Sequence, residues 1–571
     1  MTEVTRVTYD QVMFPCYHPA DLVLVRGKKC RLYDSEGRSY LDFGGGIAVN
    51  SLGNAPKTVR KALKAQSARL IHVSNVFAND ATLKFATEIT KVTGFDRVFF
   101  TNSGAEANEC ALKLARRTAV DLYGEKKDEI ISFAHSFHGR TFFTVSVGGQ
   151  DKYSLGFGPR PGAITHLPFN DIKAFEKQIS DRTCAVIFEP VQGEGGVLPV
   201  DPKFAKRVRE LCDKHHALLI MDEVQTGCAR SGTFFAYEQI GIRPDIVSTA
   251  KGIAGGYPIG CVLTSNDIAA HFKAGTHGST FGGNPLGCAV GSAVVAKISK
   301  PEFLAKVMEK GKLLREELTR VNDELHVFSA VRGMGLLDGC ELIPELRSRL
   351  GDIQKAALEA GLIILTAGGT TIRLCPPLII KKKELKEGVA ILKRVLVPFA
   401  MEVEALKRAE ALKAQEEKAQ KAVKAPTAKK PAEKAAAEKK PAEKKTAAPK
   451  AAPARRTPQK AAAKPAPAAD QAKTAAPVKA EAVRPAPAKK AAVKAPAAAA
   501  KTAAPAPKTA AAKPKAAPAA APKAAAPAPK AAPAAPAASA APVKEAPAPK
   551  AAAPAVKTAS EVKPAVVKTP A

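Results

Sequence analysis

The sequence predicts an α/β protein built on a mainly parallel sheet with helices on both faces. Apolar, strand-length runs alternate with helix-length segments as far as about residue 290, which is the pattern of a parallel sheet. Short strands flanked by helices follow, and they predict a smaller α+β domain. Beyond residue 420 the composition changes to Ala, Lys and Pro, which cannot build a packed core.

The strands expected in the large sheet are apolar and rich in β-branched residues. They are Arg97–Thr101, Glu129–Phe133, Cys184–Phe188, Ala217–Met221 and Asp245–Ser248. Between them, Ala105–Leu122 is rich in helix formers, and Pro202–His215 places Phe204, Val208 and Leu211 at helical spacing. These segments therefore alternate as strand and helix.

In the second part of the chain, helical segments near 302–322 and 352–360 flank short strands at Leu362–Leu365 and Thr371–Leu374. A body of about 400 residues normally divides into two domains. The change of character near residue 290 is where we expect that division.

The tail is strongly basic. Residues 421–571 hold 31 Lys and Arg against 7 Asp and Glu, so they carry +24 of the total formal charge of +33. They contain 27 of the 44 prolines and no Gly, Cys or aromatic residue. A charged helical linker is expected at 401–420, and disorder is expected at 421–571, because frequent proline interrupts helices.

Composition excludes several classes of protein. No window approaches 18 consecutive apolar residues, so no membrane span is expected. The first residues lack the charged and apolar regions of a secretory signal. The ten cysteines form no CxxC pair and no cluster with His at metal-binding spacing, so no metal site is expected. Reduced thiols in a cytoplasmic protein are the expectation.

Two residues at the ends of apolar strands suggest cofactor chemistry. Asp222 follows the run ALLIM, and Lys251 follows the run DIVSTA and precedes Gly252. Taken singly, they read as a strand-end Asp that caps a turn and a surface Lys. Taken together, they suggest pyridoxal phosphate, because a buried Lys can form a Schiff base with the aldehyde while an Asp keeps the ring nitrogen protonated.

A phosphate-binding segment is expected at the start of a helix. The string TNSGAEAN, residues 101–108, follows the strand Arg97–Thr101. Small residues there let backbone N–H groups approach an anion at the positive end of a helix. An ordinary Ser or Asn N-cap is the alternative interpretation.

Six motifs in order carry a resemblance to a known family. They are TNSGAEANECALKLAR, SFHGRT, FEPVQGEGG, MDEVQTGCARSG, STAKG and HGSTFGGNPLGCAV. Over roughly residues 8–400 the chain resembles the class III (subgroup II) aminotransferases among the fold-type I pyridoxal phosphate enzymes. Within that group it is most similar to the bacterial acetylornithine aminotransferase family, whose members also act on succinyl-diaminopimelate or succinylornithine.

The resemblance implies a fold and an assembly. It implies a large domain at 61–290 with a mainly parallel seven-stranded sheet, and a small α+β domain formed by residues 1–60 together with 291–400. It also implies a homodimer whose active sites lie at the interface.

The resemblance implies the residues that bind the cofactor. Lys251 is similar to the Schiff-base lysine that also carries protons, and Asp222 to the partner of the pyridine nitrogen. The remaining members of the implied cofactor site are Gly104 and Ala105 at the phosphate, Phe137 on the ring face, Gln225 near the phenolate oxygen, and Thr280 at the phosphate of the neighbouring subunit.

Four further residues are implied at the substrate. Arg140 resembles the binder of the side-chain carboxylate, and Arg373 resembles the binder of the α-carboxylate. Glu194 resembles a switch residue that neutralises Arg373 when the transferred amine is terminal. Ser279 resembles a contact to the substrate of the partner subunit. Two planar guanidinium groups suit a five-carbon diacid such as 2-oxoglutarate.

The expected activity is transfer of the δ-amino group of N-acetylornithine to 2-oxoglutarate, as in arginine biosynthesis. Other ω-amino donors stay open, namely succinylornithine, succinyl-diaminopimelate, ornithine and 4-aminobutyrate. A catalytically silent scaffold associated with DNA is the alternative of another class.

Two departures from the family pattern stand out. Relatives often carry Gly-His-x-His-Pro near residue 53, whereas this chain has the shorter Gly53–Pro56, which puts the geometry of that loop in question. Ala229 stands where the family commonly has Gly, and this change is minor if its φ is negative.

The tail at 421–571 resembles the C-terminal tails of linker histones. Its charge predicts salt-dependent, sequence-independent binding to DNA or another polyanion by counterion release. The alternatives are a solvated tail that aids solubility and a tether to an anionic membrane surface.

Overall fold

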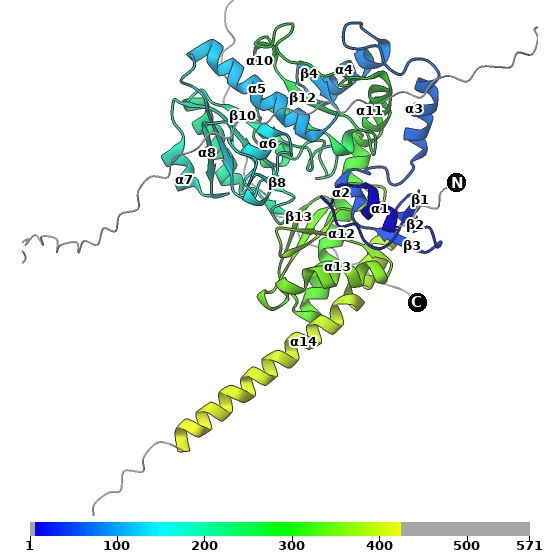
Figure 1. The fold of residues 1–571 in the computed structure, drawn as a ribbon, viewed down its shortest axis with the longest axis vertical. Coiled ribbons are helices and arrows are strands. Elements are labelled where there is room, and N and C mark those ends of the chain that lie inside the picture. Colours follow the sequence, from blue (N-terminus) through cyan, green and yellow to red (C-terminus); the bar gives the residue numbers. More distant parts are fainter. Residues whose placement is uncertain (1–5, 424–571) are drawn as a thin grey trace, which may run out of the picture. The chain divides into compact units, whose positions relative to one another are not determined.

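The large sheet has seven strands. The computed structural model describes residues 6–423 (Figure 1). Of the segment 421–571 for which disorder is expected, residues 421–423 instead continue a helix, and the rest lies outside the described residues. In sheet order the strands are β4 (Arg97–Thr101), β12 (Gly260–Thr264), β11 (Ile246–Thr249), β10 (Leu218–Asp222), β7 (Thr183–Phe188), β5 (Glu129–Phe133) and β6 (Ile164–Leu167). The strand β12 runs antiparallel to both of its neighbours, β4 and β11, and all other pairs in the sheet are parallel. Ligands bind beyond the carboxyl ends of strands in such sheets, and here Asp222 is the last residue of β10.

Alternate residues of the central strand serve two hydrophobic cores. On one face, Ile220 belongs to a core that includes α5 (Gly104–Tyr123). On the other face, Leu219 and Met221 belong to a core that includes α8 (Pro202–Lys214). This continuous burial on both faces is what a parallel strand requires, and it explains why the apolar run has no polar alternation.

Capping side chains determine where the two helices begin. Ser103 accepts a hydrogen bond from the Glu106 amide at the start of α5, and Asp201 accepts one from the Lys203 amide at the start of α8. The other helices are α1 (Arg6–Val12), α2 (Gly45–Ala48), α3 (Lys57–Ser67), α4 (Asp80–Thr93), α6 (Phe142–Val147), α7 (Ile172–Gln178), α9 (Tyr237–Ile240), α10 (Asn266–Ala269), α11 (Pro285–Ile298), α12 (Pro301–Leu325), α13 (Leu350–Glu359) and α14 (Lys382–Val423).

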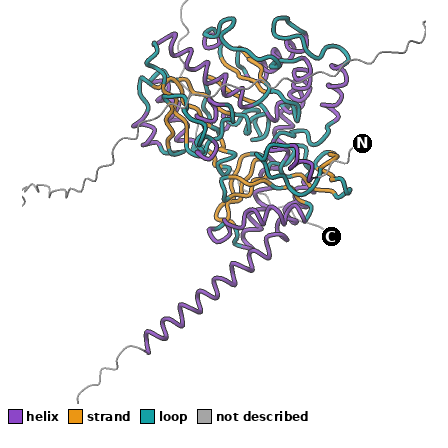
Figure 2. The backbone as a smooth tube through the Cα atoms, in the orientation of Figure 1, coloured by secondary structure: helices purple, strands orange, loops and turns teal. Residues whose placement is uncertain are grey.

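Smaller sheets lie outside the large one (Figure 2). One contains β1 (Leu24–Lys28), β2 (Arg31–Asp34), β3 (Ser39–Asp42) and β15 (Leu362–Ile363). A second contains β13 (Phe328–Met334), β14 (Leu337–Leu342), β17 (Thr371–Leu374) and β16 (Leu365–Ala367), and β8 (Val191–Gln192) pairs with β9 (Leu198–Pro199). Because β3 pairs with β15 in parallel, the N-terminal segment shares a sheet with residues more than 300 positions later.

Two expectations need adjustment. The strand expected at Leu362–Leu365 is divided between β15 and β16, which belong to different sheets. The helix expected at 401–420 exists, but it is the continuation of α14 and not a separate linker. Up to Val403 this helix buries apolar side chains, whereas every side chain from Glu404 to Lys421 is exposed. The helix is drawn in yellow in Figure 1.

Ala229 does not meet the condition of a negative φ under which the replacement of Gly would be minor. Its φ is 70° and that of the preceding Cys228 is 54°, so two consecutive residues with side chains adopt the left-handed region. Glycine is favoured there because it has no Cβ to clash with the backbone. The common Gly of the family therefore has a physical reason, and Ala229 imposes strain on this turn.

The loop at Gly53–Pro56 is closed by hydrogen bonds despite its shorter sequence. Gly53 has a φ of 78°, and a Cβ there would lie 2.5 Å from the Lys29 carbonyl oxygen. The Asn54 amide donates to that same oxygen, and Asn54 Nδ2 donates to Asp42. Asn54 thus takes over the closure of this loop.

Among the residues that the structure describes, no helix is long and apolar enough to cross a membrane, and no cluster of His, Cys, Asp and Glu is arranged to hold a metal ion. All ten cysteines are free thiols, and only Cys16 is exposed.

Candidate active site

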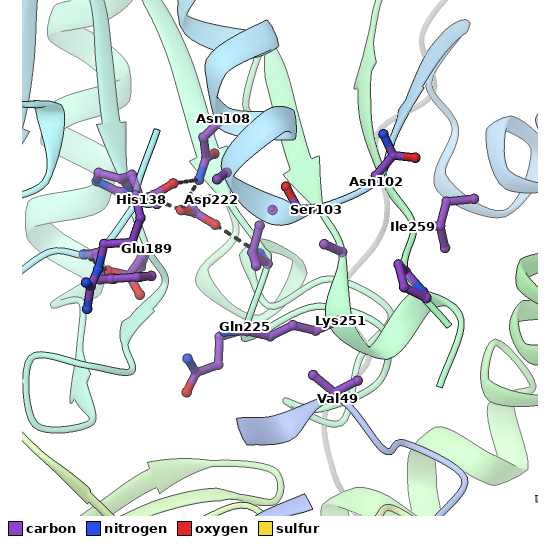
Figure 3. Close-up of a pocket in the computed structure, with 18 of the residues that line it drawn as sticks. Val49, Asn102, Ser103, Asn108, His138, Glu189, Asp222, Gln225, Lys251 and Ile259 are labelled. Atoms are coloured by element: carbon purple, nitrogen blue, oxygen red, sulfur yellow. Dashed lines mark hydrogen bonds and ion pairs between the residues drawn. The ribbon is translucent and has the colours of Figure 1, made fainter. Parts of the chain in front are cut away.

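A cavity of about 410 Å³ opens beyond the carboxyl end of β10 and the first turn of α5 (Figure 3). Its wall is formed by residues from separate strands, loops and helices. The residues predicted from sequence that line it are Gly104, Ala105, Phe137, Arg140, Asp222, Gln225 and Lys251. Residues as far apart in the sequence as Gly104 and Lys251 therefore meet at one place.

Asp222 is held rigidly at the end of the cavity. It is 2% exposed, and its Oδ2 accepts a hydrogen bond from Asn108 Nδ2 at 2.7 Å and lies 2.8 Å from His138 Nδ1. Its Oδ1 accepts from the Val224 amide at 3.0 Å. A buried carboxylate with this many donors is held in one orientation, as a partner for a ring nitrogen must be.

The supporting residues Asn108 and His138 were missed by sequence reasoning. Asn108 also donates to the His138 carbonyl oxygen at 2.8 Å, and its Oδ1 accepts from Ser248 Oγ at 2.5 Å. The available signals were the position of Asn108 one helical turn after Gly104 and the position of His138 within SFHGRT. Neither signal shows that both side chains reach Asp222.

Lys251 extends into the cavity from a strained turn. It begins the 3₁₀ turn Lys251–Ile253 directly after β11, and its φ is 44°. Among residues 6–423, no hydrogen bond or ion pair holds its amine. Burial lowers the pKa of Lys251, and the opposing charge of Glu194 does not cancel that effect. Strained backbone and a free, easily deprotonated amine are typical of a catalytic lysine.

The first turn of α5 presents unsatisfied donors to the cavity. The backbone amides of Gly104 and Ala105 have no acceptor among the described residues, because they occupy the first positions of the helix. A Cβ on Gly139 would lie 2.7 Å from the Ala105 Cβ, so this loop packs directly on the turn. The arrangement suits an anion such as a phosphate.

Glu189 is a second buried acid at the cavity wall. It accepts hydrogen bonds from the amides of Phe137 and Gly193 at 3.0 and 3.2 Å. Burial, followed by the charge of Asp222, raises the pKa of Glu189 to about 7. Glu189 was also missed from the sequence, and it holds the loop that carries Phe137.

Arg373 is connected to the cavity by hydrogen bonds to two neighbouring residues. It lies on β17 and is 3% exposed, and its Nη1 donates to Glu194 at 2.6 Å and to Gln225 at 3.0 Å. Its Nε is buried without a hydrogen-bond partner among the described residues. Burial is the largest single influence on the pKa of Glu194 and would raise it, but the charge and hydrogen bond of Arg373, together with Lys251 and Gln225, outweigh burial and lower that pKa.

Arg140 is held differently. It is exposed at the cavity wall, and no acidic side chain or hydrogen-bond acceptor in the described part of the chain pairs with it. Its guanidinium carbon lies 3.8 Å from the centre of the Tyr153 ring and 5.5 Å from that of Phe137. The N–H donors of the Arg140 guanidinium group are therefore free to bind a carboxylate.

Ser279 and Thr280 do not line this chain's own cavity. Ser279 Oγ accepts from Asn102 Nδ2 at 3.2 Å and from the Gly282 amide at 3.0 Å, which fixes the loop. Thr280 is exposed, and no described residue bonds its hydroxyl. Phe281 beside it is also exposed.

Comparison with known families decides the class of protein. The family model described as aminotransferase class III matches residues 13–396. The chain belongs to the class III aminotransferases.

Relatives and solved structures agree with this membership. The acetylornithine aminotransferase of Vibrio parahaemolyticus is 54% identical over 394 residues, which are 69% of this chain and 98% of that protein. The crystal structure of the N-acetylornithine aminotransferase from Stenotrophomonas maltophilia is 39% identical with a TM-score of 0.60, over 67% of this chain and 97% of that one. The ornithine aminotransferase of Toxoplasma gondii is 30% identical with a TM-score of 0.67, over 69% and 95% respectively.

This class III aminotransferase depends on pyridoxal phosphate, as its class does. The described residues fit the cofactor at three separate points. The free amides at the start of α5 suit the phosphate, buried Asp222 suits the ring nitrogen, and the unpaired amine of Lys251 suits the aldehyde.

Proposed function

We propose that the enzyme transfers the terminal amino group of N-acetylornithine to 2-oxoglutarate, as in arginine biosynthesis. One observation carries the proposal: Arg373, which bonds the cavity residue Gln225, is paired with Glu194, while Arg140 in the cavity wall is unpaired. A donor with a terminal amine needs only one free guanidinium for its carboxylate, whereas a diacid needs both. The 54% identity to an acetylornithine aminotransferase supports the choice of donor.

In this proposal each residue has one task. When bound, pyridoxal phosphate stores the electrons released at the substrate carbon. Asp222 would keep the ring nitrogen protonated, Gly104 and Ala105 would hold the phosphate, and Phe137 and Gln225 would contact the ring. The free amine of Lys251 takes the proton from the carbon that bears the substrate nitrogen.

The two substrates alternate in one site. In the donor half-reaction, Glu194 neutralises Arg373, and Arg140 binds the carboxylate of the N-acyl amino acid. In the acceptor half-reaction, Arg373 exchanges Glu194 for the α-carboxylate of 2-oxoglutarate, and Arg140 binds the other carboxylate. The buried, unpartnered Nε of Arg373 supports this, because it leaves a donor free for such a carboxylate.

A panel of donors tests this proposal. We expect kcat/KM to be highest for N-acetylornithine among N-acetylornithine, N-succinylornithine, succinyl-diaminopimelate, ornithine and 4-aminobutyrate. A higher value for ornithine or 4-aminobutyrate would move the enzyme to another branch of the class.

We further propose a homodimer in which Ser279 and Thr280 complete the partner's site. The exposed, unbonded hydroxyl of Thr280 supports this, as do the exposed apolar side chains of Phe281, Phe77 and Val76. Mixing Lys251→Ala and Thr280→Ala subunits tests it. A mixed dimer contains one intact site, so activity should exceed that of both parent variants.

A second function is proposed for the basic tail. The net +24 of residues 421–571 supports sequence-independent binding of DNA or another polyanion. We expect the full chain to bind duplex DNA with an affinity that falls steeply with salt, and a chain ending at Val423 to lose that binding. Absence of binding at low salt would leave a solvated tail, and binding to anionic vesicles alone would indicate a membrane-surface tether.

A further inference from the structure

The side chain of Arg140 needs something to orient it before a substrate binds. A free arginine side chain samples many rotamers, and ordering it on binding costs conformational entropy. Arg373 is ordered by hydrogen bonds to Glu194 and Gln225. Arg140 makes no such bond within residues 6–423, although a carboxylate-binding residue benefits from being placed in advance.

The contacts of Arg140 point to an aromatic support. Its guanidinium carbon lies 3.8 Å from the centre of the Tyr153 ring, and the Tyr153 and Phe137 rings meet edge to face at 5.6 Å and 83°. A guanidinium group stacked on a ring keeps its N–H donors pointing outward in its own plane. An aromatic face therefore orients the fork without occupying it.

Tyr153 is itself fixed in place before any substrate binds. It ends the 3₁₀ turn Asp151–Tyr153, and the buried Ser154 follows it. The preceding Gln150 donates from Nε2 to the carbonyl oxygens of His135 and Ser136 at 3.1 and 3.3 Å. The turn is thus tied to the loop that leads into Phe137 and Arg140.

The charges nearby leave Arg140 without a competing acid. Asp151 pairs with Arg160 at 3.7 Å, and Lys152 lies over the same Tyr153 ring at 4.8 Å. Among the described residues neither Arg140 nor Lys152 forms an ion pair, and their positive charge attracts a carboxylate.

We propose that Tyr153 is a positioning residue that holds Arg140 in its carboxylate-binding orientation through its ring face and not through its hydroxyl. The hydroxyl has no hydrogen-bond partner in the described part of the chain, whereas the ring contacts the guanidinium directly. The inference rests on the proposed function, because it assumes that Arg140 binds a substrate carboxylate.

The test compares variants of the full-length holoenzyme. In Tyr153→Leu we expect KM for N-acetylornithine, and the Kd of glutarate measured by calorimetry, to rise roughly threefold to tenfold. We expect kcat and cofactor affinity to stay within about twofold, since Tyr153 does not line the cavity. Tyr153→Phe should retain wild-type values because it keeps the ring.

Tyr123→Leu is the matched control. Tyr123 also has a cation over its ring, Lys127 at 5.1 Å, but it lies outside the site, so its loss should leave KM and glutarate binding unchanged. Tyr153→Leu should add nothing when Arg140→Ala is already present.

An equal effect of Tyr153→Leu with and without Arg140 would overturn the proposal, as would a fall in kcat and cofactor affinity at unchanged KM. Failure of the proposed function would look different. Wild-type enzyme would then turn over another donor in preference, while glutarate binding would still report on Tyr153 and Arg140.

Discussion

The two ends of the cavity are organised by different means. At the buried end, Asp222 is fixed by direct hydrogen bonds from Asn108 and His138. At the open end, Arg140 is exposed and rests on aromatic rings. The buried end fixes the carboxylate of Asp222 in one orientation, as a partner of a ring nitrogen requires. The open end must admit and release carboxylates. Aromatic rings therefore hold Arg140 in place there, while its N–H donors stay free of hydrogen-bond acceptors.

Arg373 stands between these two extremes. It is about as buried as Asp222. Its partner Glu194, however, lies on a loop, where the Glu194 carbonyl oxygen accepts a hydrogen bond from the Gly368 amide. A partner carboxylate both orients the arginine and competes with substrate. This exchange allows one pocket to serve two substrates of different charge.

The largest expected effect is at the buried end. Lys251→Ala should lower kcat by about 10⁴-fold or more, because both the attachment point and the proton carrier are lost. Activity and the absorbance of bound cofactor should disappear together. Lys310→Met is the matched control: the pKa of that lysine is also lowered by burial, to about 8, but its amine bonds the Leu378 carbonyl oxygen away from the cavity. Normal activity of Lys251→Ala would refute the assignment.

A smaller loss of kcat is expected when Asp222, or the residue Asn108 that supports it, is replaced. Asp222→Asn should lower kcat by roughly 10²- to 10³-fold, because a neutral amide no longer stabilises a protonated ring nitrogen. Asn108→Ala removes one of three donors to that carboxylate and should cost about tenfold. Steady-state kinetics at saturating cofactor measure both. Equal losses in the two variants would mean that Asp222 acts only as a structural acceptor.

An intermediate and selective effect is expected at Glu194. Glu194→Gln leaves Arg373 charged in the donor half-reaction, so that half-reaction should slow by about tenfold while the 2-oxoglutarate half-reaction is retained. Single-turnover rates of each half-reaction measure the ratio. Equal slowing of both would argue against a switch.

The pH dependence follows from the same pair. Because Arg373 lowers the pKa of Glu194 in the folded protein, the pair contributes above the ordinary glutamate pKa of about 4.3 and is lost as pH falls through the lowered value. Wild type should therefore approach the behaviour of Glu194→Gln only at acidic pH. The donor half-reaction measured against pH checks this.

The smallest expected effect concerns the backbone under the buried end. A Cβ on Gly252, next to Lys251, would lie 3.1 Å from the Cys228 Cβ, so the strained turn at Cys228 and Ala229 packs beside the catalytic turn. Ala229→Gly should stabilise the protein by about 0.5–1 kcal/mol, since glycine adopts a φ of 70° without a clash. Chemical denaturation measures the change. A loss of stability would mean that the Ala229 methyl group contributes more packing than its strain costs.

Much of the fold followed from patterns along the chain. The strands at Arg97–Thr101 and Glu129–Phe133 have the predicted bounds, and Asp222 lies at a strand end as expected. The seven-stranded sheet of the large domain and membership of class III were implied by the motifs and are confirmed. The pairing of β3 with β15 could not be read locally, because it joins segments that share no sequence signal.

For this protein, the sequence by itself determined which chemical groups are present and in what order, because periodicity and motif spacing are local properties. Only the tertiary structure decided that Asn108 and His138 meet Asp222, that Arg373 is paired while Arg140 is not, and that Ala229 is left-handed. These outcomes depend on contacts between residues far apart in the chain and on backbone angles imposed by packing, neither of which is encoded in any single segment.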